Sequence, residues 1–586
     1  MATTLNILKS SFSSVLFELY GDSLESSILQ AEVSQATSEN FGHYQCNSAP
    51  KIGKELKKNP RDIALEIKNH FENTHPDIRS FISSLDIAGA GFINITLDSS
   101  FIAQEIEKIL KNDRLAIALT SEPQKIIVEF SSPNVAKELH VGHIRSTIIG
   151  DCLARTFEFL GHDVLRLNHI GDWGTQFGML IAYINLYMPE IMKHKETSIS
   201  TLMTCYQKAK KKFDEDPNFK KQSQEEVVKL QKKEKESFLI WQFICDISRK
   251  AFQEIYEVLN VHIVERGESF YNDFLKSTVD DLEEKGLVTL SEGAKCIFIE
   301  GFIGRDGHSL PMIIQKGDGG FNYSTTDMAA LKHRISIEKA DRIIVVTDVG
   351  QSLHFDMIKK VALKAGYFDI KNTQMDHVTF GLVLGPDGKK FKTRSGETEK
   401  LIDLLDEAIK KAKEILAPRL SEESEESLNE MSSILGINCV KYADLSSVRT
   451  KDYTFSYEKM LRFEGNTAPF LLYAYVRING IKKKIKKDLC EVIKTNKIEL
   501  FHPTEVKLAL HLIQFSEVLA QLAHDLMPHK LTDYLYQLAE KFHLFFHDCR
   551  VEGDKYEDSR LLLCEATSRT LKKGLELLGL KTLEKM

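Results

Sequence analysis

Short, continuous apolar runs alternate with helical patterns through the middle of the chain. The runs are KIIVEF (125–130), DVLRLNHI (163–170), DRIIVVT (341–347) and HVTFGLVL (377–384). Apolar strands that alternate with helices are typical of a parallel sheet covered on both faces. The pattern therefore predicts an α/β sheet domain over residues 119–400.

Other patterns flank this domain. Near the N-terminus, the apolar residues at helical spacing are Leu5, Leu8, Phe12, Leu16 and Leu19. A strand-like run, GFINITL (91–97), follows, so we expect a small α+β domain over residues 1–118. After about residue 400 helical periodicity continues to the end. We expect a connecting region over 401–450 and an all-α domain over 451–586.

Some 170 residues lie between the second and third predicted strands, and we expect them to form an insertion around residues 185–300. The segment 206–237 of this insertion is rich in Lys and Glu. A charge run of this kind is more often the solvated face of a helix than a binding site. The insertion is therefore expected to contain exposed helices.

The composition is that of an ordinary globular protein that is too long for one hydrophobic core. Of 586 residues, 42% are apolar and 27% are charged, and the net charge of −7 gives no bulk attraction to nucleic acid. The nine cysteines are scattered without a C-x-x-C pair, which argues against a disulfide framework and a structural metal. No stretch approaches the length of a membrane span. We expect a cytoplasmic protein with no membrane anchor.

Two histidines stand three residues apart in SSPNVAKELHVGHIRSTIIGD (131–151), directly after a predicted strand and turn. His140 and His143 fall in the first turn of the following helix, where backbone N–H groups and the helix dipole attract phosphate. Residues three apart share a helix face, so both imidazoles can contact one phosphate group. Gly142 lacks a Cβ, which would let a flat base lie against the backbone. The pattern H-x-G-H alone also fits two ordinary histidines in a first turn.

This stretch resembles the His-Ile-Gly-His signature of class I aminoacyl-tRNA synthetases, and its flanks are similar to arginyl-tRNA synthetases. Further segments resemble the same family, in family order: LNHIGDWGTQFG (167–178), GDGGFNYSTTDMAAL (317–331), VGQSLHFDMIKKVALKAGY (349–367), LGPDGKKFKTRSGE (384–397) and RFEGNTAPFLLYAYVRI (462–478). The resemblance covers most of the chain. It implies a multidomain α/β protein with a Rossmann-like catalytic domain that carries an insertion, a small N-terminal α+β domain that contacts tRNA, and an all-α anticodon-binding domain.

The implied activity is that of an arginine-tRNA ligase. Such an enzyme uses ATP with Mg²⁺ to convert L-arginine to arginyl-adenylate and then transfers the arginine to tRNA(Arg). The implied partners are tRNA(Arg), L-arginine and ATP, and we expect a monomer without a protein-bound structural metal. By the same resemblance, His140 and His143 contact the ATP phosphates and Gly142 lies under the adenine.

The second signature of the family, usually Lys-Met-Ser-Lys-Ser, is altered in this chain. It runs Lys390-Phe391-Lys392-Thr393-Arg394, so a threonine replaces the second lysine, which grips the phosphates. Loss of an ammonium group at a developing phosphate charge is costly. The resemblance implies that Lys137, just before the first signature, compensates, with Lys390 and Lys392 as the other phosphate-binding candidates. A plain surface lysine is the alternative for Lys137.

The resemblance also implies a pocket for the substrate arginine. A planar guanidinium with five donors is best held by carboxylates. Glu129, Tyr323 and Asp327 are implied to line the guanidinium pocket, and Asn134 and Gln351 to hold the α-amino and carboxylate groups. An ordinary acid in a first helical turn is the alternative for Asp327.

Contacts to tRNA are implied at both ends of the chain. The N-terminal candidates for base contact are Asn40, Phe41 and Gln45. The C-terminal candidates are Phe470, Tyr473 and Tyr475, which offer stacking faces to unpaired bases, and the last residue, Met586. Aromatic residues at such spacing are more often part of a core.

Two other functions remain compatible with parts of the sequence. Another H-x-G-H nucleotidyltransferase would explain the first signature, but not the length or the later segments. A catalytically inactive tRNA-binding scaffold would explain the altered second signature.

Overall fold

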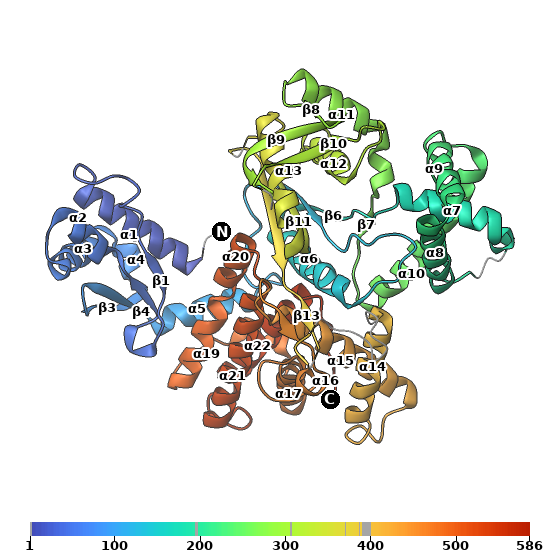
Figure 1. Cartoon of the computed structure of the whole chain (residues 1–586). Coiled ribbons are helices and arrows are strands. Elements are labelled where there is room, and N and C mark those ends of the chain that lie inside the picture. Colours follow the sequence, from blue (N-terminus) through green and yellow to red (C-terminus); the bar gives the residue numbers. More distant parts are fainter. Residues whose placement is uncertain (1–2, 194–196, 305–306, 370, 386, 390–399) are drawn as a thin grey trace. The chain divides into compact units, whose positions relative to one another are not determined.

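The computed structural model describes residues 3–193, 197–304, 307–369, 371–385, 387–389 and 400–586 (Figure 1). The chain forms two compact units. The first, which contains the predicted catalytic domain and is called the catalytic unit below, comprises Ser121–Leu461 and Leu577–Lys581. The second unit comprises Met1–Thr120, Arg462–Glu576 and Thr582–Met586.

A five-stranded parallel sheet forms the centre of the catalytic unit. Its strands are β5 (Lys125–Glu129), β6 (Asp163–Asn168), β7 (Val264–Glu265), β11 (Arg342–Asp348) and β12 (Gln374–Phe380), in the order β12-β11-β5-β6-β7. In this register Ile127 lies opposite Ile343 and Leu165. The four predicted strands are confirmed. The strand order reverses between β5 and β11, which is where open α/β sheets bind ligands.

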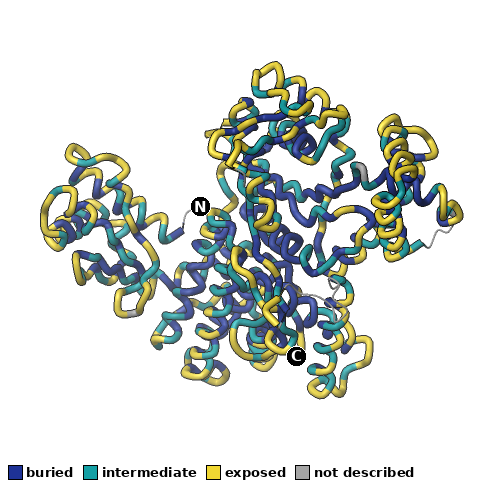
Figure 2. Tube along the Cα trace, viewed as in Figure 1, coloured by how far each residue is buried: buried dark blue, intermediate teal, exposed yellow. Residues whose placement is uncertain are grey.

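Helices cover both faces of this sheet, as predicted. On one face, α6 (Val141–Leu160) packs against β5, β6 and β11. Gly150 allows the close approach, because a Cβ there would overlap Phe130. The other face is covered by α11 (Asn272–Glu284), α12 (Tyr323–Ser336) and α13 (Ser352–Lys364). The tube of the central strands is accordingly buried in Figure 2.

The insertion consists of a helical lobe and a small sheet. The lobe contains α7 (Thr175–Tyr187), η2 (Pro189–Lys193), α8 (Ile199–Glu215), α9 (Pro217–Gln231) and α10 (Lys235–Val258). It has its own apolar core, which includes Leu180, Ile184 and Ile244. Downstream lie η3 (Glu268–Tyr271) and an antiparallel sheet of β8 (Thr289–Ser291), β9 (Ala294–Ile303) and β10 (Ser309–Gln315). The sequence pattern did not predict this sheet.

The rest of the catalytic unit is mainly helical. It contains η4 (Val349–Gln351), α14 (Leu401–Leu416), α15 (Glu425–Leu445) and α16 (Tyr457–Met460). Two short strands, β13 (Val383–Leu384) and β14 (Tyr453–Thr454), pair in parallel. The buried Arg145 of α6 donates to Asp444 of α15 at 3.3 Å, which joins the first helix of the sheet domain to this helical part.

The second unit combines an α+β part with a helical part. The α+β part contains α1 (Thr4–Tyr20), β1 (Val33–Gln35), η1 (Glu39–Phe41), β2 (Tyr44–Cys46), α2 (Ser48–Leu56), α3 (Pro60–Thr74), α4 (Pro76–Arg79), β3 (Ile82–Ala88), β4 (Phe92–Leu97) and α5 (Ser99–Leu110). Its strands form an antiparallel sheet in the order β1-β2-β4-β3. The predicted first helix and the strand near residue 92 are confirmed.

The helical part of this unit runs from residue 468 onward. Its helices are α17 (Ala468–Ile485), α18 (Leu489–Thr495), α19 (Pro503–Ile513), α20 (Phe515–Asp525), α21 (His529–Asp548) and α22 (Glu557–Leu577). The stretch Pro503–Asp525 is long and apolar enough to cross a membrane by length and composition, and 56% of its apolar window is buried inside the structure. Core helices of globular proteins pass the same test, so this stretch is weak evidence for a membrane span.

Candidate active site

The two histidines of the first signature cap the start of α6. His140 is the N-cap, and its Nδ1 accepts a hydrogen bond from the Gly142 N–H at 3.1 Å. The Nδ1 of His143 accepts one from the His140 N–H at 3.1 Å, and the ring centroids lie 4.0 Å apart. Because each Nδ1 is an acceptor, the proton of each neutral ring lies on Nε2. The imidazoles are thus fixed in one tautomer by the backbone.

His143 is a neutral group at physiological pH. Burial, together with the charges of His140 and Lys137, lowers its pKa to about 3. A neutral imidazole can donate a hydrogen bond to a phosphate, but it adds no positive charge. Positive charge at this helix start therefore has to come from the helix dipole and from lysine.

Gly142 is required by the same cap. A Cβ at this position would lie 2.8 Å from His140 Cε1, because the histidine ring folds back over the glycine. The cap alone therefore explains the glycine. Contact with an adenine base stays a prediction.

Lys137 is exposed and lies in the turn before α6. Its Nζ is 5.4 Å from the ring centroid of Tyr206 on α8, a distance typical of a cation–π contact. Its charge also contributes to the low pKa of His143. The ammonium group is therefore close to the first signature, with one side against the insertion.

Lys390 and Lys392 lie outside the described residues, as does Thr393. Directly after this segment, Lys400 Nζ lies 2.9 Å from Glu138 Oε1. The Leu401 N–H donates to the Leu139 carbonyl at 2.9 Å. The chain thus returns from the second signature to the residues just before His140.

Asp327 is surrounded by two imidazoles and a tyrosine. Its Oδ2 lies 2.6 Å from His354 Nε2, and its Oδ1 lies 3.6 Å from His169 Nε2. Burial raises the pKa of Asp327, but the hydrogen bond from His354 and the charges of both histidines outweigh it, so the pKa is lowered. The Tyr323 ring centroid is 4.9 Å from that of His354. The predicted residues Tyr323 and Asp327 are thus one turn apart on α12, and each contacts His354.

Two further carboxylates lie near Asp327: Asp172, which belongs to the family-like segment LNHIGDWGTQFG (167–178) and is implied by that resemblance to shape the same cleft, and Glu268, which sequence analysis did not single out. Burial, together with the charges of Asp327 and Asp172, raises the pKa of Glu268 to about 8. Asp172 accepts hydrogen bonds from Ser269, at 2.8 Å from the N–H and 2.6 Å from Oγ. We call Asp172, Glu268 and Asp327 the acidic cluster. Glu268 lies in the short helix η3, and no periodicity or spacing distinguishes it from a surface acid.

Glu129, at the end of β5, is already engaged in a buried ion pair. Its Oε2 lies 2.5 Å from Arg334 Nη1 on α12, and both side chains are buried. The carboxylate charge is therefore matched within the chain. Since a carboxylate accepts more than one hydrogen bond, a ligand at Glu129 would have to share it with Arg334.

Asn134 and Gln351 are exposed and come from two loops beside this region. Asn134 sits so close to Gly171 that a Cβ there would overlap its Oδ1. The Val135 N–H donates to the Gly171 carbonyl at 3.1 Å. Gln351 ends η4, three residues before His354. The Asn134 loop therefore contacts Gly171, two residues after His169, and Gln351 precedes His354 by three residues. Both histidines lie beside Asp327.

The predicted tRNA contacts differ in exposure. Asn40 and Phe41 are exposed, whereas Gln45 donates to Asn94 Oδ1 at 2.8 Å. Met586 is partly exposed.

The aromatic residues of α17 face different ways. Tyr473 is 41% exposed, and Phe470 is partly buried, with its ring centroid 5.4 Å from that of Tyr536. Tyr475 is only 6% exposed, so the prediction that it stacks on a base is wrong: its ring is part of the core.

Within the described part of the chain, no group of three or more His, Cys, Asp or Glu side chains is arranged to hold a metal ion. All nine cysteines are free thiols, and eight of them are buried.

Three family descriptions match successive parts of the chain. Residues 6–97 match "Arginyl tRNA synthetase N terminal domain", residues 105–457 match "tRNA synthetases class I (R), catalytic domain", and residues 471–586 match "DALR anticodon binding domain".

Curated relatives and solved structures agree with these matches. The chain is 54% identical to an arginine-tRNA ligase of Protochlamydia amoebophila, over 100% of both chains, and 48% identical to one of Trichodesmium erythraeum, over 99% of both. The crystal structure of arginyl-tRNA synthetase from Plasmodium falciparum is similar with a TM-score of 0.88 and 34% identity, covering 100% of both chains.

Proposed function

This chain belongs to the arginyl-tRNA synthetase family and is an aminoacyl-tRNA ligase for arginine, and we propose that its acidic cluster binds the guanidinium group of the substrate. The enzyme activates L-arginine with ATP and transfers it to tRNA(Arg). In the first step a carboxylate oxygen of arginine bonds to the α-phosphorus of ATP, and the bond to pyrophosphate breaks. In the second step a ribose hydroxyl of the tRNA attacks the arginyl carbonyl, and AMP leaves. The family match across all three regions decides against another H-x-G-H nucleotidyltransferase.

One observation carries the proposal for the guanidinium site: the acidic cluster has more negative charge than the chain neutralises. Among the described residues, neither Asp327 nor Glu268 has a lysine or arginine within ion-pair distance. The mutual repulsion of the acids contributes to the raised pKa of Glu268. A planar cation with five N–H donors would supply both the missing charge and the hydrogen bonds.

We propose that the α-amino and carboxylate groups of the substrate bind to the two loops that contain Asn134 and Gln351. Asn134 would bind the α-amino group, and Gln351 the carboxylate. Tyr323 would pack beside the guanidinium, next to Asp327. Glu129 would line the same pocket while it keeps its ion pair with Arg334.

The ATP phosphates would lie at the start of α6. His140 and His143 would donate through Nε2–H, and Gly142 would face the adenine. Lys137 is the proposed source of positive charge in place of the lysine missing at Thr393, with Lys390 and Lys392 as further contacts. Mg²⁺ would arrive with ATP, bound mainly by phosphate oxygens and water, as is usual for this ion.

The remaining assignments are proposals of the same kind. For tRNA contact we propose the residues Asn40, Phe41, Gln45, Phe470, Tyr473 and Met586. For the domain limits we propose 1–118, 119–400, 401–450 and 451–586. We further propose a monomer in the cytoplasm, and the nine free thiols support a reducing compartment.

The test is charging of cognate tRNA with labelled arginine by wild type, Lys137→Ala, Thr393→Lys and the double variant. We expect wild type to charge, Lys137→Ala to lose about 10²-fold or more in kcat, and Thr393→Lys to restore part of the loss. Near-normal charging by Lys137→Ala would contradict the proposed role of the lysine. A wild type that binds tRNA without charging it would be an inactive scaffold.

A further inference from the structure

The turn between β5 and α6 has an unusual backbone. Ser131, Ser132 and Ala136 have φ angles of 68°, 46° and 60°. This is the left-handed region, which residues with a Cβ rarely adopt. Such strain persists only where surrounding contacts hold it. Asn134 and Lys137 belong to the same turn, so its shape decides where both side chains lie.

Buried side chains hold this turn by hydrogen bonds. The Ser131 N–H donates to Ser146 Oγ at 2.9 Å. The Ser132 N–H donates to Asn168 Oδ1 at 3.0 Å. Ser131 Oγ and Tyr256 OH are hydrogen-bonded at 2.8 Å. The Tyr256 hydroxyl also accepts a hydrogen bond from Asn168 Nδ2 at 3.1 Å. The Tyr256 hydroxyl thus connects the side chain of Ser131 with Asn168, and Asn168 in turn binds the backbone of Ser132.

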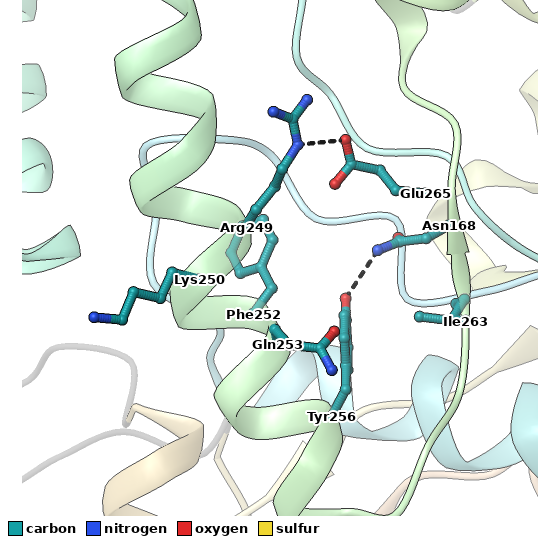
Figure 3. Close-up of a pocket in the computed structure, with 8 residues that line it drawn as sticks. All are labelled: Asn168, Arg249, Lys250, Phe252, Gln253, Tyr256, Ile263 and Glu265. Carbon is teal, nitrogen blue, oxygen red and sulfur yellow. Dashed lines mark hydrogen bonds and ion pairs between the residues drawn. The ribbon is translucent and has the colours of Figure 1, made fainter.

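A cavity of about 370 Å³ lies beside this network. Figure 3 shows Tyr256 and Asn168 in its lining, joined by the hydrogen bond between hydroxyl and amide. Tyr256 belongs to α10 of the insertion, whereas Asn168 ends β6. Burial raises the pKa of Tyr256 to about 12, so the hydroxyl keeps its proton at neutral pH. Two hydroxyls of α10 therefore link the insertion to the turn: the protonated hydroxyl of Tyr256, and that of Ser248, whose Oγ accepts from the Ala136 N–H at 3.0 Å.

We propose that Tyr256 is a positioning residue for arginine activation, whose hydroxyl holds the strained turn through Ser131 and Asn168. The tyrosine acts on the reaction through the placement of Asn134 and Lys137. The inference therefore rests on the roles proposed above for these two side chains.

The test uses two variants that remove the same hydrogen bond from opposite sides. Tyr256→Phe keeps the ring and its packing, and Ser131→Ala keeps the backbone. With cognate tRNA present, we expect each to lower kcat of arginine-dependent pyrophosphate exchange about 10- to 100-fold, because a shift of ~1 Å at a reacting group has this effect. In the same variants, the KM for arginine should rise. The double variant should be no worse than the more affected single variant, because one bond cannot be lost twice.

Tyr183→Phe is the matched control. Tyr183, on α7, is 7% exposed, and its hydroxyl makes no hydrogen bond within the described part of the chain. We expect its kcat and KM to stay within about twofold of wild type. Thermal unfolding of every variant verifies that it is folded at the assay temperature.

Normal kcat and KM in folded Tyr256→Phe and Ser131→Ala would overturn the inference. Additive effects in the double variant would overturn the route through Ser131. If Tyr256→Phe does not fold, Ser131→Ala alone decides. Normal kinetics of Lys137→Ala would contradict the proposed role of that lysine instead, so the two failures are distinguishable.

Discussion

Two groups of buried carboxylates in the catalytic unit differ in how their charge is neutralised. Asp151 of α6 is fully buried, and its oxygens lie 2.8 Å from Arg155 Nε and 2.6 Å from Arg166 Nη1. Lys441 Nζ, also buried, lies 3.9 Å away. One carboxylate is thus surrounded by three cations of the chain itself.

The surroundings of Asp151 leave no room for a ligand. Lys441 Nζ donates to the carbonyls of Leu259 and Gly579, each at 2.7 Å. Gly579 has a φ of 70°, and a Cβ there would lie 2.6 Å from Asp151 Oδ2. The cluster therefore binds the segment Leu577–Lys581 to the catalytic unit and is structural.

The charge of the acidic cluster is neutralised in a different way from that of Asp151. Two acids surround Glu268, and the groups in direct contact with the cluster are imidazoles and a serine. Among the described residues, Arg334 and Arg249 act on Asp327 and Asp172 through their charge without a direct ion pair. An acid whose cations are built in stabilises the fold. Acids whose cation is missing form a site for a cationic ligand, at the cost of repulsion in its absence.

Removing the charge of Asp151 should have the largest effect on stability. Asp151→Asn leaves buried cations without a partner, so we expect a loss of about 3–5 kcal/mol. Calorimetry should show the unfolding temperature lowered by about 5 °C or more. KM for arginine of the folded fraction should stay within about threefold of wild type. An unchanged unfolding temperature would contradict the structural role of this cluster.

Removing the charge of Asp327 should affect arginine binding much more than stability. We expect Asp327→Asn to raise KM for arginine in the exchange reaction about 10²- to 10³-fold, because a buried charged contact to the substrate is lost. The unfolding temperature should fall less than in Asp151→Asn: the variant relieves repulsion from Glu268, but it also weakens the interaction with His354 that lowers the pKa of Asp327. A large loss of stability with normal KM would make this aspartate structural as well.

The next effect is a dependence of arginine binding on pH. Glu268 has a pKa of about 8, so below pH 8 it carries a proton that a bound guanidinium must displace. Affinity should therefore fall as the pH falls below 8, by up to about tenfold per unit, and binding should release a proton. Titration calorimetry at pH 6 to 8 in buffers of different ionisation enthalpy measures both. Glu268→Gln should bind arginine with little dependence on pH, and the same dependence in this variant would rule out Glu268 as its source.

The smallest expected effect is at the start of α6. With a pKa of about 3, His143 should stay neutral throughout the physiological range. The ¹³Cε1 chemical shift of a labelled His143 should remain constant from pH 5 to 8, with His143→Gln used to assign the signal. A titration near pH 6.5 would show that this imidazole contributes charge to phosphate binding.

Local patterns predicted the parts of the fold whose residues repeat regularly. Continuous apolar runs gave β5, β6, β11 and β12, and a strand, a turn and a final glycine located α6. The antiparallel sheet β8–β10 was missed, because its strands are half-exposed and their apolar runs, CIFI (296–299) and MII (312–314), are short. Helical spacing separates the two tyrosines of α17: the buried Tyr475 lies four residues after Leu471 and three before Ile478, whereas the exposed Tyr473 lies four residues before Arg477.

The candidate site shows the same limit. Motifs led to Tyr323 and Asp327, which both contact His354 in the structure. They could not lead to Glu268, because its raised pKa comes from burial and from acids far away in the sequence. The left-handed backbone at Ser131 has no local signal either, since the contacts that hold it come from α6 and α10.

The most direct measurement compares arginine with citrulline, which has the same shape but no charge, by titration calorimetry on wild type and Asp327→Asn. The account predicts that wild type prefers arginine by about 10²-fold or more, and that Asp327→Asn loses most of this preference. If wild type binds both ligands equally, or if Asp327→Asn keeps the full preference for arginine, the acidic cluster does not recognise the guanidinium charge.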